Sequence, residues 1–347
     1  GVRREVVLGY AAMLNAGITP ITGEYGSLGC SGDLAPLAHA ALALTGEGIV
    51  RDKAGTQMPA AEALAAAGLK SITLREKEGL ALINGTDGML GQLILALTDL
   101  DTLVTTADLT TAMTVQALCG IDAVFAPDLQ ALRPHEGQKL SAANIAALLK
   151  DSPLIQAGKS EESKRVQDAY SLRCAPQVTG AVRDTMAHAA HVAQVELVSA
   201  IDNPAVTDDL RVESNGNFHG APVAYVLDFL AIAVAGLASM SERRTDRMLD
   251  PARSRGLNAF LANDPGVDSG YMIAQYTQAS IVSELKRLAV PASADSIPTS
   301  AMQEDHVSLG WSAARKLRRA VDGLGKVLGV EALTAAPVSY THLRAHE

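Results

Sequence analysis

The chain has 347 residues, of which 48% are hydrophobic and only 3% aromatic. This composition provides a large core of Ala, Leu, Val and Ile, whose small side chains suit closely packed helices. A net charge of −9, with both signs scattered, argues against a nucleic-acid-binding protein. Cys30, Cys119 and Cys174 are too far apart for a disulfide framework or a paired metal-ligand spacing, so we expect a reducing cytoplasm.

The N-terminal part alternates predicted helices with a glycine-rich loop. Apolar residues recur with helical spacing over residues 6–14, and the glycine-rich loop then occupies residues 21–33. The next helix is expected from Leu34 to Leu44, with Asp33 as its N-cap and Pro36 in its first turn. The segment "RDKAGTQM" then predicts a turn or short hairpin, and "PAAEALAAAGL" predicts a further helix.

Long segments rich in Ala, Leu and Val dominate the rest of the chain, and alternating strand patterns are nearly absent. The run from Val223 to Met240 is long enough to cross a bilayer, but Asp228 lies inside it, and we interpret it as a buried core helix. The sequence therefore predicts a mainly α fold, a bundle of long antiparallel helices with a glycine-rich loop region near the N-terminus. The long helices are expected at residues 88–119, 138–150, 176–200, 220–249, 271–290 and 306–332.

In the glycine-rich loop, Gly26, Gly29 and Gly32 surround a single serine, Ser31. A phosphate-binding P-loop would end in Gly-Lys-Ser/Thr, whereas this loop ends in Gly-Asp. The dinucleotide fingerprint requires a G-x-G-x-x-G spacing after a strand, and both are missing. A nucleophile elbow requires a second glycine at the position that Asp33 occupies. These three phosphate-binding or hydrolytic loops are therefore excluded.

A chemical role for the loop is also possible. The amide nitrogen of Gly32 could attack the carbonyl carbon of Cys30 in a tightly bent backbone, and loss of water would close an imidazolone ring. Loss of the Ser31 hydroxyl as a second water would leave an exocyclic methylene, an electrophile that no amino-acid side chain provides. The alternative is a plain helix-entry turn capped by Asp33, and the loop residues alone leave both open.

The stretch "GSLGCSGDLAPLAH" resembles the signature of the ammonia-lyase family that carries the methylidene-imidazolone (MIO) prosthetic group. The resemblance continues in the family's order through "LINGT", "VQDAYSLRCAPQVTG", "DNP", "GNFH", "SERR" and "QEDHVS", over nearly all of residues 1–336. It implies that MIO forms autocatalytically from Cys30, Ser31 and Gly32, with no metal and no diffusible cofactor.

The resemblance also implies roles for four polar residues. Asn84 of "LINGT", otherwise an Asn-Gly turn, would hydrogen-bond the prosthetic ring or the substrate carboxylate. Gln167, Tyr170 and Arg173 are three apart, which on a helix or helical turn is one face, normally a solvated one. In the family, Arg173 would bind the substrate carboxylate, and Tyr170 would act as a hydrogen-bond or proton-transfer partner with Gln167 beside it.

Two further residues bear on the substrate. The family places Phe218 next to the prosthetic ring, and Glu304 stands where phenylalanine and tyrosine members usually carry an amide. Since a carboxylate suits an imidazole, Glu304 indicates L-histidine as substrate, with trans-urocanate and ammonia as products, and Cys30 in place of alanine favours the same substrate. We interpret His219 and His306 as structural hydrogen-bonding residues and "SERR" as a structural ion-pair cluster.

We divide the chain into an MIO-bearing region (1–90), a central helical bundle (91–336) and a non-native-looking tail (337–347). Family members carry a further N-terminal region with the tyrosine that acts as catalytic base, so we expect an internal fragment of a cytoplasmic homotetramer. No nucleic-acid or membrane partner is expected. The alternatives are a phenylalanine or tyrosine ammonia-lyase or aminomutase with the same ring, and a non-catalytic helical fragment in which the loop is only a turn.

Overall fold

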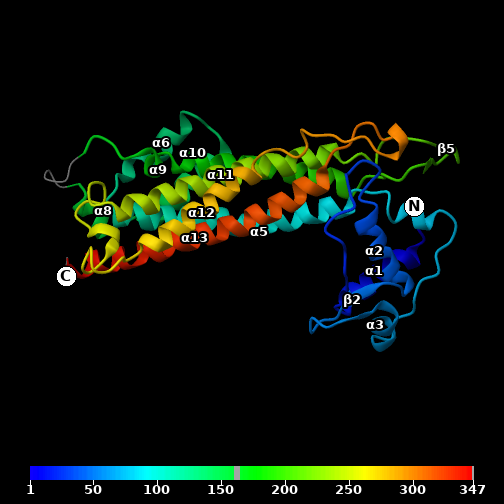
Figure 1. Cartoon of the computed structure of the whole chain (residues 1–347). Helices are drawn as coiled ribbons and strands as arrows, with labels where there is room; N and C mark the ends of the chain where they lie inside the picture. The colour runs from blue at the N-terminus through cyan, green and yellow to red at the C-terminus, as the bar shows by residue number, and fades with distance from the viewer. Residues whose placement is uncertain (160–164, 346–347) are drawn as a thin grey trace. The chain divides into compact units, whose positions relative to one another are not determined.

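The computed structural model describes residues 1–159 and 165–345, and the chain divides into two compact units, each built from three separate segments (Figure 1). The fold is mainly α, with long helices, as the composition predicts. The first unit contains residues 1–93, 192–227 and 292–315, and the second contains 94–191, 228–291 and 316–347.

The N-terminal part of the first unit packs short helices on a small antiparallel sheet. The central strand pairs with both neighbours through Val50, which lies opposite Pro20 on one side and Met58 on the other. This confirms the predicted hairpin. Val6 and Leu44 are among the residues of its core. The elements are α1 (Arg4–Asn15), β1 (Thr19–Pro20), α2 (Ala35–Thr45), β2 (Ile49–Arg51), β3 (Gln57–Pro59), α3 (Ala60–Ala66) and α4 (Glu78–Ala81).

The later segments of the first unit are mostly loops. A two-stranded antiparallel sheet, β4 (Ala205–Val206) with β5 (Val212–Glu213), precedes the turn that carries Phe218. The short 3-10 helix η4 (Ser300–Met302) precedes Glu304. Trp311, the only tryptophan of the chain, donates a hydrogen bond from its indole nitrogen to the carbonyl oxygen of Glu24 at 2.8 Å.

The long helices agree with the predicted segments to within a few residues, except that the last begins at Gly310 and runs through Pro337. They are α5 (Asp87–Ala117), α7 (Glu136–Leu149), α10 (Ala175–Leu197), α11 (Ala221–Leu249), α12 (Met272–Leu288) and α13 (Gly310–Ala345). Short elements connect them: η1 (Asp122–Phe125), α6 (Pro127–Ala131), α8 (Pro153–Ala157), α9 (Tyr170–Arg173) and η3 (Ala259–Leu261).

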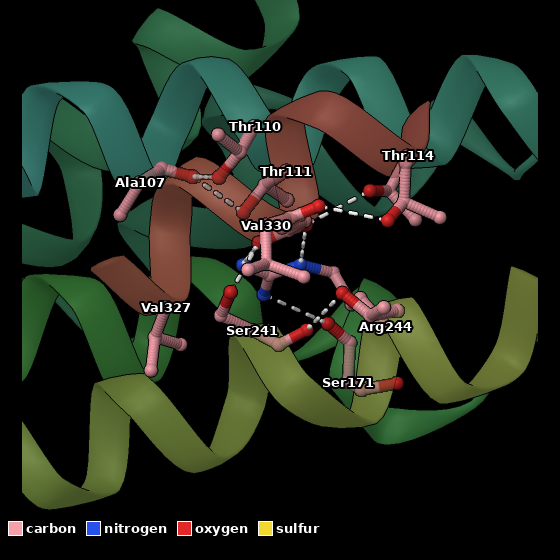
Figure 2. A network of polar contacts seen from close by, with 12 residues as sticks. Ala107, Thr110, Thr111, Thr114, Ser171, Ser241, Arg244, Val327 and Val330 are labelled. Carbon is pink, nitrogen blue, oxygen red and sulfur yellow. Dashed lines mark hydrogen bonds and ion pairs between the residues drawn. The ribbon is translucent and has the colours of Figure 1, made fainter. Parts of the chain in front are cut away.

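A buried ion pair links α11 to α13 inside the second unit (Figure 2). Arg244 and Glu331 are both fully buried, and their side chains meet in two hydrogen bonds of 2.5 and 2.8 Å. Glu331 also accepts hydrogen bonds from Thr114 of α5 at 2.8 Å and from Ser241 at 2.6 Å. Each buried charge is therefore paired and hydrogen-bonded, which is the condition for such a pair to be tolerated in a core. This confirms that "SERR" belongs to a structural ion-pair cluster.

Two of the described helices, α5 and α11, are long and apolar enough to span a membrane by length and composition alone. In α11, 61% of the most apolar 18-residue window is buried inside the fold. Asp228 within it is buried and forms an ion pair with Lys316 at 2.6 Å. This burial agrees with the interpretation of residues 223–240 as a core helix.

Candidate functional site

The glycine-rich loop adopts backbone conformations that only glycine reaches easily. Gly26, Gly29 and Gly32 have φ angles of 118°, 67° and 78°. A Cβ atom on Gly32 would lie 2.4 Å from the amide nitrogen of Gly85, far inside van der Waals contact. The positive φ angles therefore favour glycine at all three positions, and Gly32 is required in addition by the close approach of the backbone at Gly85.

Asn84 lies directly against the tripeptide Cys30-Ser31-Gly32. Its side chain is 2% exposed, and its Nδ2 donates to the carbonyl oxygen of Ser31 at 2.6 Å and to the Ser31 hydroxyl at 2.9 Å. Among the described residues, its buried Oδ1 has no hydrogen-bond partner. The Asn84 amide thus faces the tripeptide and keeps one acceptor unused, so it does more than form a turn.

Both ends of the tripeptide are fixed to other parts of the first unit. On the N-terminal side, the carbonyl oxygen of Gly29 accepts from the Ser308 hydroxyl at 2.6 Å and from the Gly220 amide at 2.9 Å. On the C-terminal side, the Asp33 amide donates to the carbonyl oxygen of Gly85 at 2.8 Å. The three residues of the tripeptide therefore bridge two anchored points.

The predicted role of Asp33 as the N-cap of α2 is wrong. Leu34 occupies the N-cap position, and no side chain caps this helix. The fully buried carboxylate of Asp33 instead accepts from the Ser27 hydroxyl at 2.8 Å and from the Met89 amide at 2.8 Å. Burial raises the pKa of Asp33 to about 6. Local spacing suggested the cap, but hydrogen bonds to more distant residues decide the orientation of this side chain.

Cys30 contacts Glu304, another of the predicted catalytic residues. The thiol is 5% exposed and donates to Oε2 of Glu304 at 3.3 Å, and burial raises the pKa of Cys30 to about 11, so the thiol keeps its proton. The Thr299 hydroxyl donates to the same oxygen at 2.8 Å and holds the pKa of Glu304 below its usual range. The carboxylate therefore remains ionised beside the tripeptide.

The backbone between Thr299 and Glu304 is strained. Ser300, Ala301 and Met302 have φ angles of 52°, 53° and 69°, a conformation rare for residues with a side chain. A run of this kind persists only where surrounding contacts fix it, and such runs are found at functional sites.

Phe218 lies partly buried in a turn that is closed by a hydrogen bond from the His219 amide to the carbonyl oxygen of Gly216 at 3.1 Å. Two residues later, the Gly220 amide binds Gly29 of the loop. The imidazoles of His219 and His306 stack in parallel at 5.7 Å, and Nε2 of His219 lies 3.2 Å from the carbonyl oxygen of His306. These contacts confirm His219 as a structural hydrogen-bonding residue.

The remaining predicted residues belong to the second unit. Helix α9 covers only Tyr170–Arg173, so Gln167 precedes it and does not share its helical turn, contrary to the expected face of three. The Arg173 guanidinium lies over the Tyr170 ring at 4.7 Å from its centroid, a cation–π arrangement. Among the described residues, the buried Nε of Arg173 has no hydrogen-bond partner, and the Tyr170 side chain is largely exposed. The Tyr170 side chain is therefore open to solvent, and within the described part of the chain the Arg173 guanidinium keeps one buried donor unused.

Sequence reasoning missed two serines of the site. Ser27 holds the Asp33 carboxylate, and Ser308 holds the loop at Gly29. The position of Ser308 at the end of "QEDHVS" was its only signal, because a lone serine after a valine has no distinctive spacing. In the described part of the chain, no group of three His, Cys, Asp or Glu side chains is arranged to hold a metal ion.

Comparison with known proteins assigns the class. Residues 1–344 match the model of the family described as aromatic amino acid lyase, so the chain belongs to that family. It is 68% identical over 335 residues to the histidine ammonia-lyase of Streptomyces coelicolor, covering 96% of this chain and 65% of that relative. The chain thus spans 65% of the length of this curated relative.

Solved structures share the fold. The crystal structure of histidine ammonia-lyase from Trypanosoma cruzi matches with a TM-score of 0.88 and 40% identity, over 99% of this chain and 64% of that one. Tyrosine aminomutase from Streptomyces globisporus matches with a TM-score of 0.89 and 40% identity, over 97% of this chain and 66% of that one. Since proteins named for different substrates and reactions share the fold, the choice of substrate depends on individual side chains.

Proposed function

We propose that the protein represented by this chain eliminates ammonia from L-histidine to give trans-urocanate. The contact of Glu304 with Cys30 carries the proposal, because it brings an ionised carboxylate to the tripeptide. The 68% identity to a histidine ammonia-lyase supports the same substrate. In this reaction the Cβ–H and Cα–N bonds break, a Cα=Cβ double bond forms, the proton passes to a base and the amine leaves as ammonia.

The tripeptide fits the prosthetic group that the family resemblance implies. The positive φ of Gly32 and its packing against Gly85 support a tight bend, and the unused acceptor of Asn84 is free for a further partner. In the proposed cyclisation, the Gly32 nitrogen bonds to the Cys30 carbonyl carbon. The first water takes the carbonyl oxygen and the amide hydrogens of Ser31 and Gly32. The second takes the Ser31 hydroxyl and its Cα hydrogen. The resulting methylidene-imidazolone supplies an electrophile for the substrate amine.

Glu304, Asn84 and Phe218 would then select and hold the substrate. Glu304 would accept a hydrogen bond from an imidazole N–H, and its lowered pKa supports a carboxylate that stays ionised for this purpose. Asn84 would hydrogen-bond the prosthetic ring or the substrate carboxylate, and Phe218 would provide an apolar wall.

The family resemblance assigns the amino-acid part of the substrate to three further residues. Arg173 would bind the carboxylate in a bidentate pair, which its unpartnered Nε supports. Tyr170 would act as a hydrogen-bond or proton-transfer partner, with Gln167 beside it. These roles follow from the family resemblance.

We further propose a cytoplasmic homotetramer. Large apolar side chains are exposed on α11 and α12, with Phe229, Ile232, Ile273 and Tyr276 each 47–60% exposed. Exposed apolar residues on neighbouring long helices favour burial against another subunit. Light scattering of the purified protein would measure the assembly.

The second candidate is a tyrosine or phenylalanine lyase or aminomutase with the same prosthetic group. The 40% identity to a tyrosine aminomutase structure supports this candidate. Glu304 separates histidine from phenylalanine, because a phenyl ring has no N–H or O–H to donate to a carboxylate, and the substrate assay below separates histidine from tyrosine. A non-catalytic helical fragment is the third possibility, in which the tripeptide would remain an ordinary peptide.

The first experiment is the mass of the proteolytic peptide that contains Cys30-Ser31-Gly32, in the wild type and in Ser31→Ala. We expect the wild-type peptide to lack two waters and the variant peptide to be intact. The full-length protein that contains this chain is then assayed with L-histidine, L-phenylalanine and L-tyrosine, and Glu304→Gln is expected to lose histidine turnover while keeping the modified peptide. An intact wild-type peptide would overturn the prosthetic group, and turnover of L-tyrosine alone would overturn the substrate.

A further inference from the structure

The loop end that precedes Cys30 is held by a segment far along the chain. The Ser308 hydroxyl donates to the carbonyl oxygen of Gly29 at 2.6 Å, across 279 positions. The next residue continues this contact, because the Leu309 amide donates to the carbonyl oxygen of Leu28 at 2.8 Å. Ser308 is 2% exposed, and a Cβ atom on Gly29 would lie only 2.3 Å from its Oγ. Residues 28–29 and 308–309 are thus fitted closely to each other.

Ser308 touches none of the atoms that react in the proposed cyclisation. It binds the residue before Cys30, whereas the bond would form between the Cys30 carbonyl carbon and the Gly32 nitrogen. Its hydroxyl hydrogen bond is nevertheless the shortest of those that fix Gly29, where the Gly220 amide donates at 2.9 Å. The opposite end of the tripeptide is fixed separately, by the Asp33 amide on Gly85.

We infer that Ser308 is a positioning residue for the backbone cyclisation, an inference that rests on the proposed function. Closing a five-membered ring brings two backbone atoms much closer than an extended tripeptide allows. Fixing both ends of the tripeptide in advance removes the conformations in which these atoms are apart, and so speeds an intramolecular reaction. If the end at Gly29 is released, the tripeptide can relax away from the bend.

The same contact sets an order of events. Since Ser308 belongs to the segment 292–315, that segment must fold onto the loop before the N-terminal anchor is complete. Cyclisation would therefore follow the docking of residues 308–309, although the reacting residues lie near the start of the chain.

The test compares Ser308→Ala with Ser296→Ala in the full chain. Ser296 is a matched control, because its Oγ accepts a hydrogen bond from the Val307 amide at 3.0 Å inside the same segment, whereas the Ser308 hydroxyl donates to the loop itself. Each protein is made by cell-free synthesis, and the fraction of the Cys30–Gly32 peptide that lacks two waters is measured against time. Thermal melting by circular dichroism verifies that each variant is folded.

We expect Ser308→Ala to cyclise about fivefold more slowly or worse, the effect of losing one buried hydrogen bond, and Ser296→Ala to cyclise at the wild-type rate. Ser308→Thr, which keeps the hydroxyl donor, should restore the rate. Folded Ser308→Ala that cyclises as fast as the wild type would overturn this inference alone. Equal slowing in Ser296→Ala, or no recovery in folded Ser308→Thr, would likewise contradict positioning by the hydroxyl. A wild-type peptide that never loses water would overturn the prosthetic group and this inference together.

Discussion

The thiol of Cys30 donates a hydrogen bond to the carboxylate of Glu304, although the two residues are 274 positions apart. The thiol acts as donor because burial raises its pKa to about 11. Glu304 receives a second hydrogen bond at the same oxygen from Thr299. Cys30 of the tripeptide thus orients Glu304, the side chain that we propose to bind the imidazole of the substrate.

The first prediction concerns alkaline pH. The folded pKa of Cys30, about 11, lies above the ordinary thiol value of 9.0, so the unfolded chain releases this proton first. The contribution of Cys30 to the free energy of unfolding is therefore complete below pH 9 and lost as pH rises toward 11, a change on the order of 2 kcal/mol. Urea denaturation at pH 8 and pH 10.5 should show a smaller decline for Cys30→Ala than for the wild type. Cys119→Ala is the control, and an equal decline in both variants would contradict the prediction.

The second prediction concerns Asp33 at acid pH. Burial raises its pKa from 3.8 to about 6, so between these values the folded state holds a proton that the unfolded state has released. Its contribution to stability is therefore complete below pH 4 and lost as pH rises through 6, on the order of 3 kcal/mol.

Asp33→Asn cannot titrate, so its stability relative to the wild type should improve from pH 4 to pH 7. At pH 4 the free energy of unfolding of Asp33→Asn should be lower than that of the wild type, because one of the two donors, Ser27 or Met89, would face an NH₂ group. Denaturation curves at both pH values measure the difference, with the exposed Asp101→Asn as control. A pH-independent difference would show that Asp33 titrates normally.

The third prediction separates backbone strain from steric clash. Gly55 and Gly32 have positive φ angles of 90° and 78°, but a Cβ atom on Gly55 meets nothing within 4 Å. Gly55→Ala should cost only about 1–2 kcal/mol of strain. Gly32→Ala should cost more, because the new methyl group would collide with the Gly85 nitrogen, and its peptide should retain both waters. Similar melting temperatures for the two variants would argue against the observed packing.

The fourth prediction concerns the buried pair Arg244–Glu331. Glu331→Leu alone should lower the free energy of unfolding by about 3–5 kcal/mol, because it leaves the Arg244 charge buried without a partner. Arg244→Met combined with Glu331→Leu should recover much of the loss. A complete double-mutant cycle by urea denaturation measures the coupling. A double variant no more stable than the worse single variant would show that the pair does more than neutralise charge.

Local pattern sufficed for the long helices but not for the contacts of the site. Helical spacing located α11 and α12 closely, since their apolar faces repeat along the chain. The last long helix was expected from residue 306 but begins at Gly310, because the residues before it pair with the loop at Leu28 and Gly29. The paired residues are at least 279 positions apart in the sequence, and helical periodicity does not predict contacts at such a separation.

The site divides in the same way. Family motifs pointed to Asn84 and Glu304, and both lie against the tripeptide. The cap assigned to Asp33 was wrong. An aspartate just before a helix is a good N-cap by local rules, but in the folded chain its carboxylate accepts a hydrogen bond from the Met89 amide instead. Ser308 was missed, because its importance depends only on which backbone oxygen lies opposite its hydroxyl.

Trp311 lies three residues after Ser308, is almost completely buried, and donates a hydrogen bond to the carbonyl oxygen of Glu24 inside the glycine-rich loop. As the chain has no other tryptophan, its fluorescence reports on this one location. The emission should shift toward shorter wavelength when residues 308–311 leave water and settle on the loop. Docking of residues 308–311 on the loop can thus be followed optically in unlabelled protein, independently of any covalent change in the backbone.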